Sequence, residues 1–252
     1  MKDIVKPNRV HLIDEIRGFA IICMVVYHTF FDLVVTFNVN IPVFRSTFIQ
    51  TLVVIFVFIF VFISGSSSAF SRSNFKRGLI CLGFGLTLTA VTYFFIPDLL
   101  IVFGILHMLG TCMILYALLQ KLLNKIPPFA LIVGGILLYM FTYHVVDGYL
   151  GLQSLFFIEL PPALYKTGFL IPFGFISNSF YSSDYFALFP WFFCFIAGSG
   201  FGRLLKDNKL PTFFYQMHLK PLAFVGRHTF VIYILHQPIV FLILSLIFAV
   251  IR

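Results

Sequence analysis

Seven long apolar stretches constrain the fold of this chain more than any other feature of its sequence. Each is close to the 20 or so residues that a helix needs to cross about 30 Å of hydrocarbon. Only 10% of the 252 residues are charged, whereas a soluble domain carries roughly 25%. The sequence therefore predicts an all-α, polytopic transmembrane helix bundle, formed by residues 1–252 as a single domain. The stretches lie near residues 13–36, 48–70, 78–96, 99–120, 128–147, 185–205 and 228–251.

The positions of the lysines and arginines predict which ends of the spans face the cytoplasm. With the N-terminus inside, 14 of the 17 cations fall in cytoplasmic segments, and only Arg45, Lys166 and Arg252 fall outside. Such an excess marks the cytoplasmic side. We therefore expect a multi-pass plasma (inner) membrane protein with its N-terminus inside and its C-terminus outside. The net charge of +8 then reflects topology, and no nucleic-acid partner is expected. The cytoplasmic set is Lys2, Lys6, Arg9, Arg17, Arg72, Lys76, Arg77, Lys121, Lys125, Arg203, Lys206, Lys209, Lys220 and Arg227.

The longest segment expected outside, residues 148–184, is too apolar for a free loop. It is interrupted by Pro161, Pro162 and Pro172, which prevent one continuous helix. Apolar segments that do not span are accommodated at the membrane interface or packed against protein. We expect interfacial helices or a re-entrant cap on the outer face. The apolar exterior, in a chain with 36 Phe residues, would also allow a homodimer in the lipid bilayer.

The first span carries ionisable residues that a simple anchor would not keep. Each costs about 2.5–3.5 kcal/mol at the bilayer centre on insertion scales. At about 100° per residue, Asp14, Arg17, His28 and Asp32 fall on one face of the helix. Asp14 and Arg17, one turn apart, can simply pair at the inner interface. In the outer half, Asp32 can orient the His28 imidazole and raise its basicity, which predicts that this span lines a functional site.

Two other spans carry a histidine among apolar residues: His107 in the fourth and His236 in the seventh. Pro238 cannot donate to the carbonyl of Ile234, so a freed acceptor and a kink are expected beside His236. Histidines on separate helices can converge on one site. The alternative is that each is a core histidine satisfied by a neighbour. No metal is expected, because these spans hold no carboxylate or second histidine at ligand spacing.

The inner end of the second span reads SGSSS over residues 64–68 and is followed by Arg72 and Arg77. Small residues allow helices to approach closely, which is one interpretation of this stretch. The other is a phosphate-accepting pocket, in which small side chains give access and nearby cations supply charge. An arginine-rich inner face would suit a polyanionic cofactor. No P-loop or GxGxxG sequence supports a nucleotide triphosphate enzyme.

Five segments, taken in order, resemble one family of membrane enzymes. They are LIDEIRGFAIICMVVYHTFFD, FVFISGSSSAF, FGILHMLG, SSDYFALFPWFFCFIAGSGFGRLL and VGRHTFVIYILHQPIV. Together they resemble the prokaryotic members of the heparan-α-glucosaminide N-acetyltransferase-like family of transmembrane acyltransferases. The likeness covers nearly the whole chain. Its most specific parts are the opening D-x-x-R-G helix and the closing GRHT…YILHQP helix.

The resemblance implies a reaction that crosses the membrane. Such proteins take acetyl from acetyl-CoA on the cytoplasmic side and deliver it to an amino or hydroxyl group of a sugar or glycan on the other side. The polar face of the first span would then line the route between the two sides, and the inner cations would hold the CoA phosphates. The residues expected to contact CoA are Asp14, Arg17, Ser66, Arg72, Arg77 and Arg227.

A histidine is the expected general base, because its ordinary pKa suits removal of the acceptor's proton. In lysosomal members of the family, a histidine after the first span is central to transfer, but residues 36–47 here contain none. We therefore assign the base first to His28 held by Asp32. His107 and His236 are the alternatives or assisting groups. The expected acceptor contacts are Asp184, Tyr185, Trp191 and Gln237.

Two other classes of protein fit parts of the same pattern. A proton-coupled transporter or flippase would use the polar face as a relay and would bind no CoA. A non-catalytic membrane subunit would not require so much costly polarity inside its spans. Binding of CoA separates the acyltransferase from both.

Overall fold

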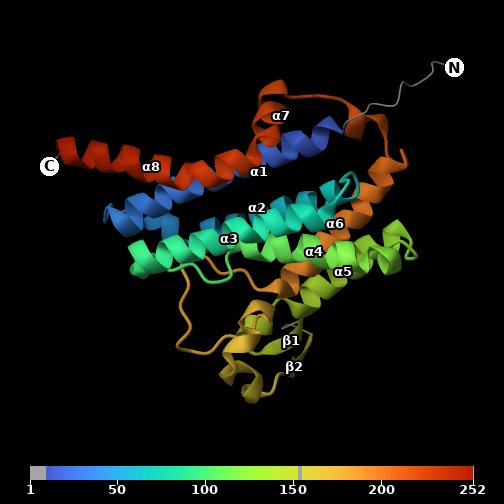
Figure 1. Cartoon of the computed structure of the whole chain (residues 1–252), viewed down its shortest axis with the longest axis horizontal. Coiled ribbons are helices and arrows are strands. Elements are labelled where there is room, and N and C mark those ends of the chain that lie inside the picture. The colour runs from blue at the N-terminus through green and yellow to red at the C-terminus, as the bar shows by residue number, and fades with distance from the viewer. Residues whose placement is uncertain (1–9, 153–154, 252) are drawn as a thin grey trace. The chain divides into compact units, whose positions relative to one another are not determined.

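The computed structural model describes residues 10–152 and 155–251, and most of them are helical (Figure 1). The predicted all-α polytopic fold is confirmed, because seven helices in the described ranges are long and apolar enough to cross a membrane. Lys2, Lys6, Arg9 and Arg252, which contributed to the predicted orientation, lie outside the described residues. The candidate spans are His11–Thr36, Thr47–Ser68, Asn74–Phe95, Ile105–Leu123, Pro128–Asp147, Leu188–Lys206 and Thr229–Val250.

The α-helices follow the apolar stretches of the sequence, and short 3₁₀ turns connect them. The first α-helix continues into a π-helical segment, η1 (Asp32–Thr36). The α-helices are α1 (His11–Phe31), α2 (Thr47–Ser68), α3 (Asn74–Phe95), α4 (Ile105–Leu123), α5 (Pro128–Thr142), α6 (Leu188–Lys206), α7 (Lys220–Arg227) and α8 (Thr229–Ile251). The 3₁₀ turns are η2 (Pro42–Arg45), η3 (Pro97–Leu99), η4 (Val145–Asp147), η5 (Pro162–Lys166), η6 (Gly168–Phe173) and η7 (Thr212–Tyr215).

The chain forms two compact units, and the boundary between them falls inside α2. Unit 1 joins the chain up to Ile63 with the part that begins at Asn208, so it contains α1, most of α2, α7 and α8. Unit 2 is Ser64–Asp207. That the two units act as one domain remains a prediction.

Unit 1 is held together by a very close approach of α7 to α1. A Cβ atom added to Gly18 would lie 2.0 Å from the carbonyl oxygen of Leu222, and one added to Gly226 would lie 1.7 Å from that of Asp14. Backbone therefore packs on backbone, as small residues permit in membrane helices. α8 lies beside α1 in the same unit (Figure 1). Near the far end of this pair, the rings of Phe37 and Phe248 stack at 4.6 Å between centroids.

Unit 2 packs its helices in pairs, α3 with α4 and α5 with α6. Its centre is fully buried and includes Met108, Cys112, Cys194 and Phe195. The four cysteines, all of them among the described residues, form no disulfide, in agreement with their positions in apolar stretches. They fill space as small apolar side chains.

The segment expected to form interfacial helices or a re-entrant cap, residues 148–184, contains a β-hairpin as well as short 3₁₀ helices. After the 3₁₀ turn η4, β1 (Tyr149–Leu152) and β2 (Phe156–Glu159) form an antiparallel hairpin, and the 3₁₀ turns η5 and η6 follow. Gly148 and Gly151 take φ values of 99° and 117°, which right-handed helices do not contain. The prolines downstream lack the N–H group that an α-helix needs. These glycines and prolines therefore prevent a continuous α-helix here, although the segment is apolar.

Candidate functional site

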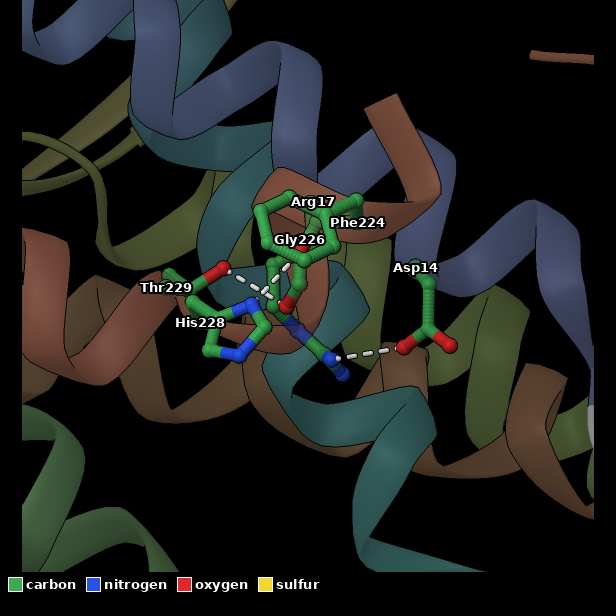
Figure 2. A network of polar contacts seen from close by, with 6 residues as sticks. All are labelled: Asp14, Arg17, Phe224, Gly226, His228 and Thr229. Atoms are coloured by element: carbon green, nitrogen blue, oxygen red, sulfur yellow. Dashed lines mark hydrogen bonds and ion pairs between the residues drawn. The ribbon is translucent and has the colours of Figure 1, made fainter. Parts of the chain in front are cut away.

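The N-terminal end of α1 carries an ion pair beside the junction of α7 and α8. Arg17 Nη1 lies 3.1 Å from Asp14 Oδ1, the pairing that their spacing of three residues predicts. Figure 2 shows Arg17 directed toward Asp14, with His228 and Thr229 of the α7–α8 junction grouped nearby. Asp14 is buried and Arg17 is half-buried, so this cation is held in place near the N-terminal end of α1.

The junction between α7 and α8 is closed by two local hydrogen bonds. Thr229 donates from Oγ1 to the carbonyl of Gly226 at 2.8 Å. His228 donates from Nδ1 to the carbonyl of Phe224 at 2.9 Å, because a carbonyl can only accept (Figure 2). Arg227 is exposed, and its guanidinium carbon lies 5.9 Å from the centroid of the Phe224 ring.

Glu15 has a role that the sequence did not reveal. Its Oε1 accepts from the backbone N–H groups of His218, at 2.7 Å, and Leu219, at 3.1 Å. Its Oε2 lies 3.5 Å from Nδ1 of His218. These amides stand at the start of α7, so the buried carboxylate of one helix caps the N-terminus of another. The partners are 203 and 204 residues apart, which no local pattern could indicate.

At the C-terminal end of α1, Asp32 is held by Gln237 of α8. Nε2 of Gln237 donates to both carboxylate oxygens, at 2.9 and 3.0 Å, and Asp32 is buried. The expected hydrogen bond to His28 is absent between these two described residues, which corrects the predicted His28–Asp32 pair. The amide supplies two donors to an acceptor-only carboxylate, so it outcompetes an imidazole on the same helix. Asp32 also opens η1, and π-helical turns are frequent at functional sites.

His28 instead faces His236, with ring centroids 5.0 Å apart and ring planes inclined by 58°. Nδ1 of His236 lies 2.6 Å from the carbonyl oxygen of Tyr233. Because a carbonyl only accepts, Nδ1 carries the proton, and Nε2 is left with a free lone pair. Nε2 is buried and has no hydrogen-bond partner among the described residues. The structure thus brings together two of the three predicted histidines.

Oε1 of Gln237 is also buried without a hydrogen-bond partner in the described chain. Two neighbouring residues of α8 therefore each present an acceptor atom that no donor satisfies. A buried acceptor left unpaired costs about 1–3 kcal/mol and calls for a physical explanation. A ligand with N–H or O–H donors, bound between α1 and α8, would satisfy both atoms.

His107 lies in unit 2, where its contacts favour a packing role. Thr89 donates from Oγ1 to the carbonyl of Ile101 at 2.8 Å, so Nε2 of His107, 3.1 Å from that hydroxyl, is the donor to it. Nδ1 has no hydrogen-bond partner among the described residues and faces Gly85, where an added Cβ would lie 2.9 Å away. The imidazole thus fills the space that Gly85 leaves between α3 and α4.

The residues of unit 2 expected to bind CoA differ in how far they are exposed to solvent. Ser66 is completely buried, and an added Cβ on Gly202 would lie 2.1 Å from its carbonyl oxygen. The SGSSS stretch therefore lets α6 approach α2, the first of its two interpretations. Arg72 and Arg77 are exposed at the turn before α3 and on its first turn.

Arg203 has a structural contact that the sequence did not predict. Its Nη1 donates to the carbonyls of Leu123, at 3.0 Å, and Ile126, at 2.9 Å. Leu123 is the last residue of α4 and Ile126 lies just beyond it, at the helix end where a positive charge is favourable.

The residues expected at the acceptor mouth of unit 2 make protein contacts. Asp184 Oδ2 accepts from the backbone N–H of Ile105 at 3.1 Å and so caps the start of α4. Burial raises the pKa of the Asp184 carboxyl to about 6, although this hydrogen bond opposes the shift. The Tyr185 hydroxyl donates to the carbonyl of Ile171 at 2.6 Å, and burial raises its pKa. Trp191 is buried, with ring contacts to Tyr139 and Phe186.

The described residues contain no group of three or more His, Cys, Asp or Glu side chains placed to hold a metal ion. What they contain is a pair of histidines between two candidate spans, His28 half-buried and His236 buried, with an unprotonated ring nitrogen and a buried carboxylate one turn away. Ionisable groups at such depth mark functional sites in membrane proteins. The fold and the site thus define a polytopic membrane protein with a polar site among its spans.

Comparison with protein-family models identifies the family. Residues 9–238 match the model described as heparan-alpha-glucosaminide N-acetyltransferase, catalytic. Because the match covers most of the chain, the protein belongs to this family of membrane acetyltransferases, and the resemblance seen in the sequence is confirmed. Neither the curated proteins nor the solved structures include a match to the chain.

Proposed function

We propose that this protein takes acetyl from acetyl-CoA on the cytoplasmic side and transfers it to an amino or hydroxyl group of a sugar or glycan on the outer side. The family supports the acetyltransferase class. The lysine and arginine distribution supports an inner-membrane protein with a cytoplasmic N-terminus. The observation that carries the proposal is the buried lone pair on Nε2 of His236, beside His28.

The acceptor must lose a proton as its nitrogen or oxygen attacks the thioester carbonyl. Nε2 of His236 is the atom prepared to take this proton, because Tyr233 fixes the other ring proton on Nδ1. His28, whose ring lies against that of His236, is the second group placed to receive it. The base is thus reassigned from His28 held by Asp32 to a His28–His236 pair.

Gln237 and Asp32 position this pair and the acceptor. The hydrogen bonds from Gln237 to Asp32 fix the carboxamide, so its Oε1 can accept a second donor from the acceptor, such as another N–H or a neighbouring hydroxyl. In the balanced step, the acceptor atom bonds to the acetyl carbon and the thioester C–S bond breaks. The acceptor's proton goes to the histidine pair, and CoA leaves as the thiolate.

The donor would bind at the inner end of α1, where Arg17 is the cation of the D-x-x-R-G motif. Acetyl-CoA supplies the activated thioester. Asp14 orients the Arg17 guanidinium by the ion pair at 3.1 Å. A fixed guanidinium suits a phosphate, because its N–H groups match phosphate oxygens. Arg227 and the exposed Arg72 and Arg77 are further candidates for contacts with the CoA phosphates.

The test begins with calorimetry of CoA and acetyl-CoA on detergent-purified protein, wild type beside Arg17→Ala. We expect micromolar binding that Arg17→Ala weakens. Acetyl transfer to hexosamines and oligosaccharides would then be compared between wild type, His236→Gln and His28→Gln, with His144→Gln as the matched control. Loss of general-base catalysis should lower the rate about 10²–10⁴-fold without loss of CoA binding. If neither CoA nor acetyl-CoA binds, the acyltransferase assignment is refuted.

A further inference from the structure

The segment between α6 and α8 has an exposed face whose residues, Arg227 apart, have no role in the proposed reaction. It spans residues 208–228 and contains η7 and α7. Its cations are Lys209, Lys220 and Arg227, and it contains no carboxylate. Yet large apolar side chains are also exposed on it. The exposed fractions are 56% for Phe213, 55% for Leu219 and 59% for Phe224.

On α7, the cations and the apolar ring share one side of the helix. Lys220, Phe224 and Arg227 are exposed and follow the spacing i, i+4, i+7, which places them on one face. Ala223 and Gly226, on the neighbouring side of the helix, are buried. An outward face that mixes aromatic and basic side chains matches neither bulk water nor hydrocarbon. It matches the boundary between phospholipid headgroups and acyl chains.

The face is fixed to the inner end of α1, the first span. Glu15 caps α7 through the amides of His218 and Leu219. Gly18 and Gly226 allow the two backbones to touch. The segment therefore cannot turn its apolar side chains toward a core of its own without breaking these contacts. They stay exposed at the depth where a span leaves the membrane.

We propose that this basic–aromatic face, made of Lys209, Phe213, Lys220 and Phe224, binds the headgroups of anionic phospholipids. The rings would enter the boundary of the leaflet at the inner end of α1, and the lysines would contact the negative headgroups. Charge complementarity selects this partner, because the segment holds cations and no carboxylate. Each lysine near an anionic surface favours binding about five-fold.

A tryptophan reporter tests the proposal directly, because Trp191 is the only tryptophan of the chain. In a Trp191→Phe background, Phe224→Trp places the fluorophore on the face. The protein would be reconstituted in vesicles of phosphatidylcholine and phosphatidylglycerol, with one or the other lipid brominated on its acyl chains. We expect stronger quenching by brominated phosphatidylglycerol. Adding Lys220→Gln should lower the relative affinity for that lipid about five-fold.

Matched variants keep the test specific. Phe241→Trp, on an exposed position of α8, should be quenched equally by the two lipids. Lys121→Gln, which removes a charge at the end of α4, should leave the ratio at Phe224→Trp unchanged. Phe213→Trp is the second reporter if Phe224→Trp does not fold. The proposal is overturned if both reporters escape quenching, if the two lipids quench them equally, or if added CoA relieves the quenching.

Discussion

Gln237 of α8 donates from Nε2 to both carboxylate oxygens of Asp32 on α1, at 2.9 and 3.0 Å. This contact joins two candidate membrane spans by a polar interaction between residues 205 positions apart. It satisfies the donors of the amide and leaves its Oε1 as a buried acceptor. The same turn of α8 carries the free lone pair of His236. At the α1–α8 interface, the Asp32 carboxylate therefore has its hydrogen-bond donor, whereas Nε2 of His236 and Oε1 of Gln237 can each still accept one.

Removal of the amide should destabilise unit 1. Gln237→Leu would leave the buried Asp32 carboxylate without its donor, a loss of about 1–3 kcal/mol or more because the group is charged. Thermal unfolding in detergent measures the loss. Asp32→Asn is the matched control, because its carbonyl oxygen can still accept from Gln237. A Gln237→Leu protein as stable as wild type would show that the contact does not support the helix pair.

The Glu15 cap should contribute stability to α7 specifically. Glu15→Ala removes the acceptor for two backbone N–H groups at the start of that helix, at an expected cost of about 1–2 kcal/mol. Hydrogen exchange of the α7 amides should accelerate accordingly. Glu15→Gln keeps one acceptor oxygen and should restore most of the protection. Equal exchange in Glu15→Ala and wild type would contradict the capping role.

The close approach of α1 and α7 makes Gly226 intolerant of a side chain. A Cβ atom there would lie 1.7 Å from the Asp14 carbonyl oxygen, a backbone atom that cannot move alone. We expect Gly226→Ala to lose at least about 1–3 kcal/mol through overpacking, and to give little folded protein. Gly134→Ala on α5 is the control, since an added Cβ meets nothing within 4 Å there. Its unfolding temperature should match wild type or exceed it slightly.

Asp184 should make stability depend on pH. Burial raises the pKa of its carboxyl from 3.8 to about 6, so the folded state holds this proton more tightly than the unfolded state does. The contribution is fully present below pH 3.8 and is lost as the pH rises through about 6. Asp184→Asn, which still accepts from Ile105, should flatten the unfolding temperature over this range. A wild-type profile that rises with pH in step with the variant would refute this assignment.

Much of the fold could be predicted because the bilayer leaves a chain few solutions. Spans must be helical, apolar and about 20 residues long, and each predicted span has a helix in the structure. The 148–184 segment was less predictable, because Gly148 and Gly151 with positive φ introduce a hairpin into an apolar stretch. The ion pair of Asp14 and Arg17 followed from their spacing on one helix.

The candidate site, too, could be predicted only in part from the sequence. The sequence by itself determined the spans, the polar face of α1 and the histidines within apolar helices, because these depend on composition and on a fixed helical period. Only the tertiary structure decided that Asp32 binds Gln237, that His28 meets His236 and that Glu15 caps α7. Those contacts join residues some 200 positions apart. Which partner a side chain binds there depends on the competing groups that other helices bring close to it. Spacing along one helix carries no information about that competition.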